Sequence, residues 1–102
     1  METYTLGCRY DSRNSFYGKA IVVETREKNY FKTVLYSYNT EVGSVELFYD
    51  ECGLEVEKAI YKYYGRYSQT TTRHQKEFFR QQGLMEDEID ELFKNGSLIR
   101  EY

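Results

Sequence analysis

The hydrophobic spacing of this chain changes once along its length, from a strand-like period to a helix-like period. Between residues 30 and 49, side chains that suit a core alternate with others, as in strands that present one face to a core. Between residues 71 and 94, apolar side chains recur every three or four positions, as they do in amphipathic helices. Strands followed by helices are typical of the α+β class. At 102 residues the chain is predicted to form one α+β domain, residues 1–102.

An antiparallel meander of three to four strands is the predicted sheet. Its strands are residues 16–25, 30–38 and 42–49, with a fourth candidate at residues 54–64. The fourth segment has two interpretations, because its apolar spacing also fits a helix that ends at Gly65. The tyrosine-rich end of this segment, residues 61–64, favours a strand. Residues 3–6 and 98–99 have a weaker, strand-like composition.

Two C-terminal segments are predicted to form helices that pack on one face of this sheet. The first begins near Ser68 or Thr70, since either side chain can cap a helix, and it ends at Gly83. The second spans residues 85–94 and has one apolar face. That face consists of Met85, Ile89, Leu92 and Phe93. Asn95 and Gly96 are expected to end the second helix.

Charge is unevenly distributed in the last half of the chain, although the formal net charge is only −3. Residues 58–82 carry six basic side chains and one acidic side chain, Glu77. Residues 86–94 carry five acidic side chains and one basic side chain, Lys94. The sequence therefore predicts a basic strand–helix unit that is followed by an acidic helix.

The basic unit is the predicted macromolecule-binding surface, because cations neutralise phosphates and aromatic rings stack on unpaired bases. The predicted contact residues are Tyr63, Arg66, Tyr67, Arg73, Lys76 and Arg80. A second predicted patch could imitate phosphates toward a cationic partner. This acidic patch consists of Glu86, Asp87, Asp90 and Glu91. The alternatives are a solvated strand edge with an exposed Arg73–Glu77 pair, and a helix whose outer side is merely acidic.

A catalytic role is not expected from this sequence. The run from Thr70 to His74 could donate hydrogen bonds to a phosphate, or it could simply cap and pack a helix. No nucleophile or acid is spaced to work with His74, and this histidine with Cys8 and Cys52 does not form a zinc pattern. We therefore expect no enzyme activity, no metal and no cofactor. No apolar run approaches the ~20 residues of a membrane helix, so a cytoplasmic protein without a membrane partner is expected.

Residues 67–83 resemble a motif of small proteins from bacteriophages and mobile elements of Gram-positive bacteria. In this motif a Tyr-Ser pair precedes TT-x-RH, and an acidic–aromatic pair and a glutamine–glycine end follow. The matching residues are Tyr67, Ser68, Thr70, Thr71, Arg73, His74, Glu77, Phe78, Gln82 and Gly83, with Thr72 in the variable position. Residues 37–40 resemble an upstream element of the same group.

The resemblance implies a phage or plasmid accessory protein that acts inside a bacterial host. Such proteins include inhibitors of host defence, anti-CRISPR proteins among them, which bind a nuclease complex stoichiometrically. The expected function is therefore an inhibitor that docks on a host protein or ribonucleoprotein. One alternative is a small nucleic-acid-binding accessory or regulatory protein. Another is a homo-oligomeric phage structural component, for instance a homodimer, in which the surplus among the 12 tyrosines forms the subunit interface.

Overall fold

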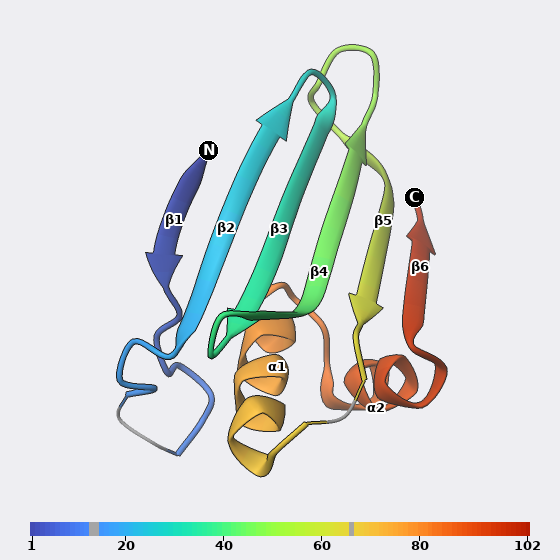
Figure 1. Cartoon of the computed structure of the whole chain (residues 1–102). Coiled ribbons are helices and arrows are strands. Elements are labelled where there is room, and N and C mark those ends of the chain that lie inside the picture. Colours follow the sequence, from blue (N-terminus) through green and yellow to red (C-terminus); the bar gives the residue numbers. More distant parts are fainter. Residues whose placement is uncertain (13–14, 66) are drawn as a thin grey trace.

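The computed structural model describes residues 1–12, 15–65 and 67–102, and it contains one sheet and two helices (Figure 1). The strands are β1 (Glu2–Thr5), β2 (Ala20–Glu27), β3 (Tyr30–Ser37), β4 (Thr40–Tyr49), β5 (Val56–Tyr63) and β6 (Ser97–Glu101). The helices α1 (Gln69–Gln81) and α2 (Glu86–Asn95) lie between β5 and β6 in the chain. Each strand pairs antiparallel with its sequence neighbour, in the order β1-β2-β3-β4-β5-β6. The α+β class and the antiparallel meander are confirmed.

The number of strands was underestimated, because the sheet has six strands and not three to four. The additional strands are the two edges, β1 and β6, which have 4 and 5 residues. Strands this short carry little periodic signal of their own, and each is held by a single neighbour. Because β6 follows α2 and pairs with β5, the helices are not the last elements of the chain. None of the described helices is long and apolar enough to cross a membrane.

The segment with two interpretations, residues 54–64, forms strand β5, as its tyrosines indicated. Its register pairs Tyr61 with Val45 and Tyr63 with Gly43, so both tyrosines face the helices. The opposite face of β5 carries Lys58, Ile60 and Lys62. The rings and cations that are mixed in the sequence are therefore separated onto two faces. The aromatic–cationic surface expected on this strand does not form.

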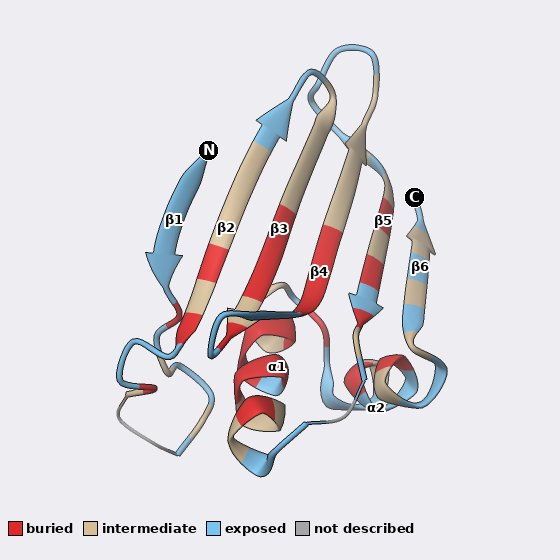
Figure 2. Ribbon diagram, viewed as in Figure 1, coloured by how far each residue is buried: buried red, intermediate tan, exposed pale blue. Residues whose placement is uncertain are grey.

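The hydrophobic core lies between the helices and one end of a single sheet face (Figures 1 and 2). Leu35, Phe78, Phe79, Leu84 and Leu92 are its largest fully buried apolar side chains. Helix α1 approaches β4 closely at Gly43, where an added Cβ would lie 3.0 Å from the ring of Phe79. Glycine is needed at this position because any side chain would occupy the space of that ring.

The ends of both helices follow from local chemistry. Ser68 is the N-cap of α1, and its Oγ accepts a hydrogen bond from the amide of Thr71 at 3.2 Å. At the start of α2, a carboxylate oxygen of Glu88 accepts a hydrogen bond from the amide of Met85 at 3.0 Å. Gly96 ends α2 in the left-handed conformation, at a φ of 83°. The predicted ends of the second helix are therefore correct to within one residue.

An ion pair between Glu88 on α2 and Arg100 on β6 connects the last strand to the helix layer. The hydrogen bond from Arg100, with the one from the Met85 amide, lowers the pKa of Glu88 below its ordinary value of 4.5. The folded state therefore favours the ionised form of Glu88 over the protonated form. The stability that the ionised side chain contributes is fully present above the ordinary pKa and is lost as the pH falls through the lowered pKa.

We expect Glu88→Gln to lower the free energy of unfolding by about 1 kcal/mol at neutral pH, because the partly exposed ion pair is lost. The difference from the unsubstituted protein should shrink as the pH falls below 4.5. Urea unfolding at neutral and acidic pH measures it. Glu86→Gln, on the exposed side of the same helical turn, is the matched control and should cost little. A loss that is equal at both pH values would contradict the assignment.

Candidate functional site

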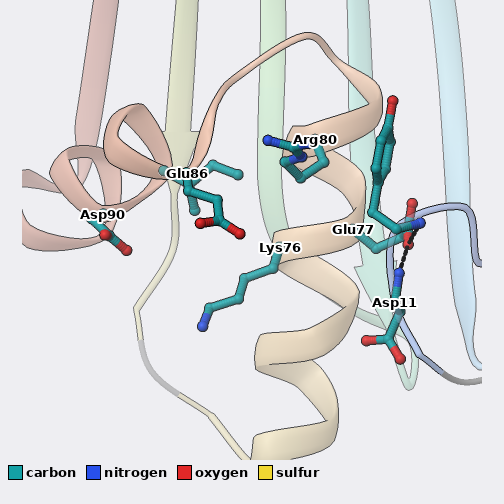
Figure 3. A pocket seen from close by; sticks show the side chains of 8 residues that line it. Asp11, Lys76, Glu77, Arg80, Glu86 and Asp90 are labelled. Carbon is teal, nitrogen blue, oxygen red and sulfur yellow. Dashed lines mark hydrogen bonds between the residues drawn. The ribbon is translucent and has the colours of Figure 1, made fainter.

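A groove separates α1 from α2 and is lined by side chains of both helices, which we call the inter-helix groove. It consists of a hollow of about 400 Å³ beside the loop between β1 and β2, and a wider hollow of about 960 Å³ beside the end of β5. Lys76 and Asp90 line both hollows, so the two adjoin. Figure 3 shows the smaller hollow, with Lys76 and Arg80 on α1 and with Glu86 and Asp90 across the gap on α2.

The basic wall of the groove comes from α1. Arg73, Lys76 and Arg80 follow one another at intervals of three and four residues, which places them on one side of the helix. Arg73 forms an ion pair with Asp11, with 3.3 Å between Nη1 and Oδ1. The guanidinium of Arg80 lies 4.7 Å from the ring centroid of Tyr10, a distance typical of a cation–π contact. Two of the three cations are thus held in place by the loop between β1 and β2.

Lys76 differs from its two neighbours on this wall. Its side chain is exposed, and it pairs with no carboxylate among the residues that the structure describes. It also lies where the two hollows adjoin. Of the three cations on the α1 wall, Lys76 is therefore the one that no described residue holds in place and that can reach a ligand from either hollow.

The acidic wall comes from α2. Glu86 and Asp90 are four residues apart, and both are exposed and line the smaller hollow. The other two residues of the predicted acidic patch, Asp87 and Glu91, are exposed on α2 but line neither hollow. The basic and acidic surfaces, which the sequence presents one after the other, become the two walls of one groove.

Five of the six predicted contact residues line this groove. Tyr63 was expected on the surface but is only 8% exposed, and its ring stacks on Phe93 with 4.1 Å between centroids. It contributes to the groove from the core side, because the alternation of β5 turns it toward the helices. Tyr67 is exposed at the edge of the wider hollow. Arg66 lies outside the described residues.

Glu77 is buried against the loop between β1 and β2, and it is not the exposed partner of Arg73 that the sequence allowed. Its Oε1 accepts hydrogen bonds from the amides of Tyr10 and Asp11, each at 2.8 Å. Its Oε2 accepts a hydrogen bond from Nε2 of Gln81 at 2.6 Å. These bonds hold the loop against α1 and position the two loop residues that support the basic wall. A sequence pattern cannot reveal these hydrogen bonds, because 66 and 67 residues separate the partners.

The start of α1, where the sequence suggested either a phosphate site or a cap, contributes two side chains to a buried polar cluster. Thr71 and His74 are both buried. The Oγ of Ser37 lies 3.0 Å from Oγ1 of Thr71 and 2.8 Å from Nδ1 of His74. The imidazole also packs against the rings of Phe16 and Tyr38, with 4.5 and 5.8 Å between centroids. This arrangement is that of a packing histidine.

Residues 37–40 and the start of α1 contact each other in the fold. Residues 37–40 form the turn between β3 and β4, with positive φ angles of 50° at Tyr38 and 68° at Asn39. These angles are typical of the tight turn that matches the twist of a hairpin. Ser37 and Tyr38 then contact Thr71 and His74 on α1. These contacts connect the β3–β4 turn to the helix.

A protein-family model matches residues 4–95, which run from β1 to the end of α2 and include both walls of the groove. The chain belongs to this family, which is described as a family of unknown function (DUF8033). No curated protein and no solved structure matches the chain. Within the described residues, no group of three or more His, Cys, Asp or Glu side chains is placed to hold a metal ion. The description of the family assigns no activity.

Proposed function

We propose that this protein is a non-enzymatic inhibitor of a bacterial defence system, and that it docks on a nuclease or nucleoprotein through the inter-helix groove. The observation that carries the proposal is the opposite charge of the two walls, with Lys76 and Arg80 facing Glu86 and Asp90. A nucleoprotein offers the complement of both walls, because its nucleic acid is anionic and the surface that binds the nucleic acid is cationic. The resemblance of residues 67–83 to proteins of phages and mobile elements supports the inhibitor role.

Inhibition would occur by occupation of the place where nucleic acid meets protein. The carboxylates of α2 would lie against the cationic surface, and the cations of α1 would lie against phosphates. Such complementary charge increases the association rate and rejects like-charged partners more than it raises affinity. Asp11 and Tyr10 already hold Arg73 and Arg80, so these side chains lose less conformational entropy when a partner binds.

Reversal of a single charge on either wall should weaken partner binding by about 10- to 100-fold, the effect of losing about 1–3 kcal/mol at an interface. The two variants are Lys76→Glu and Asp90→Lys, both at exposed positions, so the free energy of unfolding should change little. The matched control is Lys28→Glu, at an exposed lysine in the turn between β2 and β3. Affinity for the captured partner measures the effect.

The partner is captured from a lysate of a Gram-positive host with the tagged protein, before and after nuclease treatment. A nuclease or ribonucleoprotein that remains bound after treatment, and that is lost with Lys76→Glu, is the expected result. A partner that is retained equally by both groove variants would contradict the proposal.

Direct nucleic-acid binding is the second candidate, and the wider hollow favours it. Among the described residues, that hollow is lined by three cations, Arg73, Lys76 and Lys94, beside the exposed ring of Tyr67 and a single carboxylate, Asp90. Cations and rings in one groove suit an unpaired strand. Recovery of bulk DNA or RNA only, lost on nuclease treatment and in higher salt, would support this function in place of the inhibitor.

A further inference from the structure

The sheet face opposite the helices, which we call the open face, is more apolar than a solvated face should be. The strand registers place Ile21, Val23, Val34, Tyr36, Ile60 and Ile99 on it. In an antiparallel sheet with one solvent-exposed face, apolar residues that point to the core normally alternate with polar residues that point to the solvent. Strand β2 breaks this rule, because Ile21 and Val23 point outward while Ala20 and Val22 point to the core. No described helix packs on this face (Figure 1).

The aliphatic side chains of the open face form two clusters, and Tyr30 and Phe48 add an aromatic pair on β3 and β4, with 5.2 Å between ring centroids. On β2 and β3, Val23 pairs with Val34 and Ile21 pairs with Tyr36. On β5 and β6, Ile60 pairs with Ile99, which is 55% exposed. Directly paired side chains of an antiparallel sheet lie on the same face and contact each other. Each cluster is therefore continuous across two strands.

Charges of both signs lie between and beside the two clusters. Glu46 pairs across the strands with Lys32 and lies 3.8 Å from the ammonium of Lys62. At one end of the face, Lys58 pairs with Glu101. Glu27, which pairs with Tyr30, is a third carboxylate on this face, so the three lysines are offset by three carboxylates. A surface of this kind has no net attraction for a polyanion, but it can complement a copy of itself.

The size of the open face fits a modest protein interface. Six strands about 4.8 Å apart, with central strands of about eight residues at about 3.3 Å each, cover roughly 600 Å². Two such faces in contact would bury roughly 1,200 Å², which is the lower limit for a stable, specific complex. The two apolar clusters occupy part of this area, and contiguous apolar patches on a monomer often mark a binding surface.

We propose that the open face binds the open face of a second copy of this chain, which gives a symmetric homodimer. The two sheets would pack as a sandwich, and the aligned strands of such sandwiches cross at a small angle. Glu46 of each copy would then approach the lysines of the other. The helices of both copies would lie on the outside, so both inter-helix grooves would stay accessible. A dimeric protein would therefore present two binding grooves on opposite sides.

Sedimentation equilibrium over micromolar to millimolar concentrations tests the proposal. The mass should rise from that of one chain, 12.3 kDa, to that of two. Val23→Lys and Ile21→Lys should each raise the dissociation constant at least about tenfold, because each buries a charge with no carboxylate paired to it across the strands. The matched control is Leu54→Lys, at a position that is 82% exposed in the turn between β4 and β5, and it should dimerise normally. A constant monomer mass, or variants that dimerise like the control, would overturn the proposal.

A second measurement uses only the unsubstituted chain, so it does not depend on the folding of any variant. Amide chemical shifts recorded as the concentration rises should change on the open face of β2 to β5 and stay constant on α1 and α2. Changes confined to the inter-helix groove would overturn the proposal. Shifts on the open face that appear only after addition of a single-stranded oligonucleotide would overturn it as well. The Lys76→Glu variant should still dimerise, which separates this inference from the proposed function.

Discussion

Replacing Phe79 by alanine is expected to lower the free energy of unfolding by about 3–5 kcal/mol. Phe79 is fully buried, and its ring packs against Phe78 and Phe93, with 5.1 and 6.4 Å between centroids. Alanine would leave a cavity where α1, α2 and β4 meet. Because a small domain has only about 5–15 kcal/mol of stability in total, this loss would bring the chain close to unfolding. Urea denaturation followed by far-ultraviolet circular dichroism measures it.

The same contact can be tested from the strand. In Gly43→Ala the new Cβ would lie 3.0 Å from Cζ of Phe79 and 3.4 Å from the carbonyl oxygen of Lys62. We therefore expect this substitution to lower the free energy of unfolding by about 1–3 kcal/mol. Gly7→Ala, where no atom lies within 4 Å of the added Cβ, is the matched control. Phe79→Leu in the Gly43→Ala background should restore part of the loss, and strictly additive effects would contradict the contact.

Replacing Glu77 by alanine is the second change with a large expected effect. It should lower the free energy of unfolding by about 2–4 kcal/mol. Its carboxylate is buried and accepts hydrogen bonds from two backbone amides and one side-chain amide. Without it the amides of Tyr10 and Asp11 lose their acceptor, and the loop between β1 and β2 should separate from α1. Amide hydrogen exchange at these two residues should become much faster.

The control for Glu77 is the substitution Glu77→Gln. Glutamine keeps an oxygen that can accept both backbone hydrogen bonds and loses only the acceptor for Gln81, so it should lower the free energy of unfolding less than alanine does. Unchanged amide exchange in Glu77→Ala would contradict the anchoring role. Because the loop holds Arg73 and Arg80 in the basic wall, partner binding should also weaken in Glu77→Ala, although Glu77 itself is buried.

Several elements follow directly from local patterns. Helix α2 could be predicted almost exactly, because its apolar spacing, its acidic first turn and Gly96 all indicate the same boundaries. The face assignment of β3 also follows from strict alternation, and the register with β2 agrees with it. The preferred interpretation of residues 54–64 was correct because tyrosine and β-branched side chains fit a pleated surface.

The candidate site could be predicted only in part. The residue types on each wall are visible in the sequence, and Lys76 and Asp90 were both expected to take part in binding. That the two walls face each other depends on the connection at residues 82–85, where Leu84 is buried and turns the chain between the helices. The support from Tyr10 and Asp11 comes from a loop that is remote in sequence.

The α+β class, the two helices, the central strands and the charges available for binding could all be inferred from the sequence. Each of these features depends on residues within a few positions of one another. Tertiary contacts were needed for the pairing of the edge strands β1 and β6, for the burial of Glu77 and for the meeting of basic and acidic residues in one groove. All three depend on contacts between distant residues. The free energy of such contacts comes from packing and from buried hydrogen bonds, and neither has a local period that a sequence pattern can report.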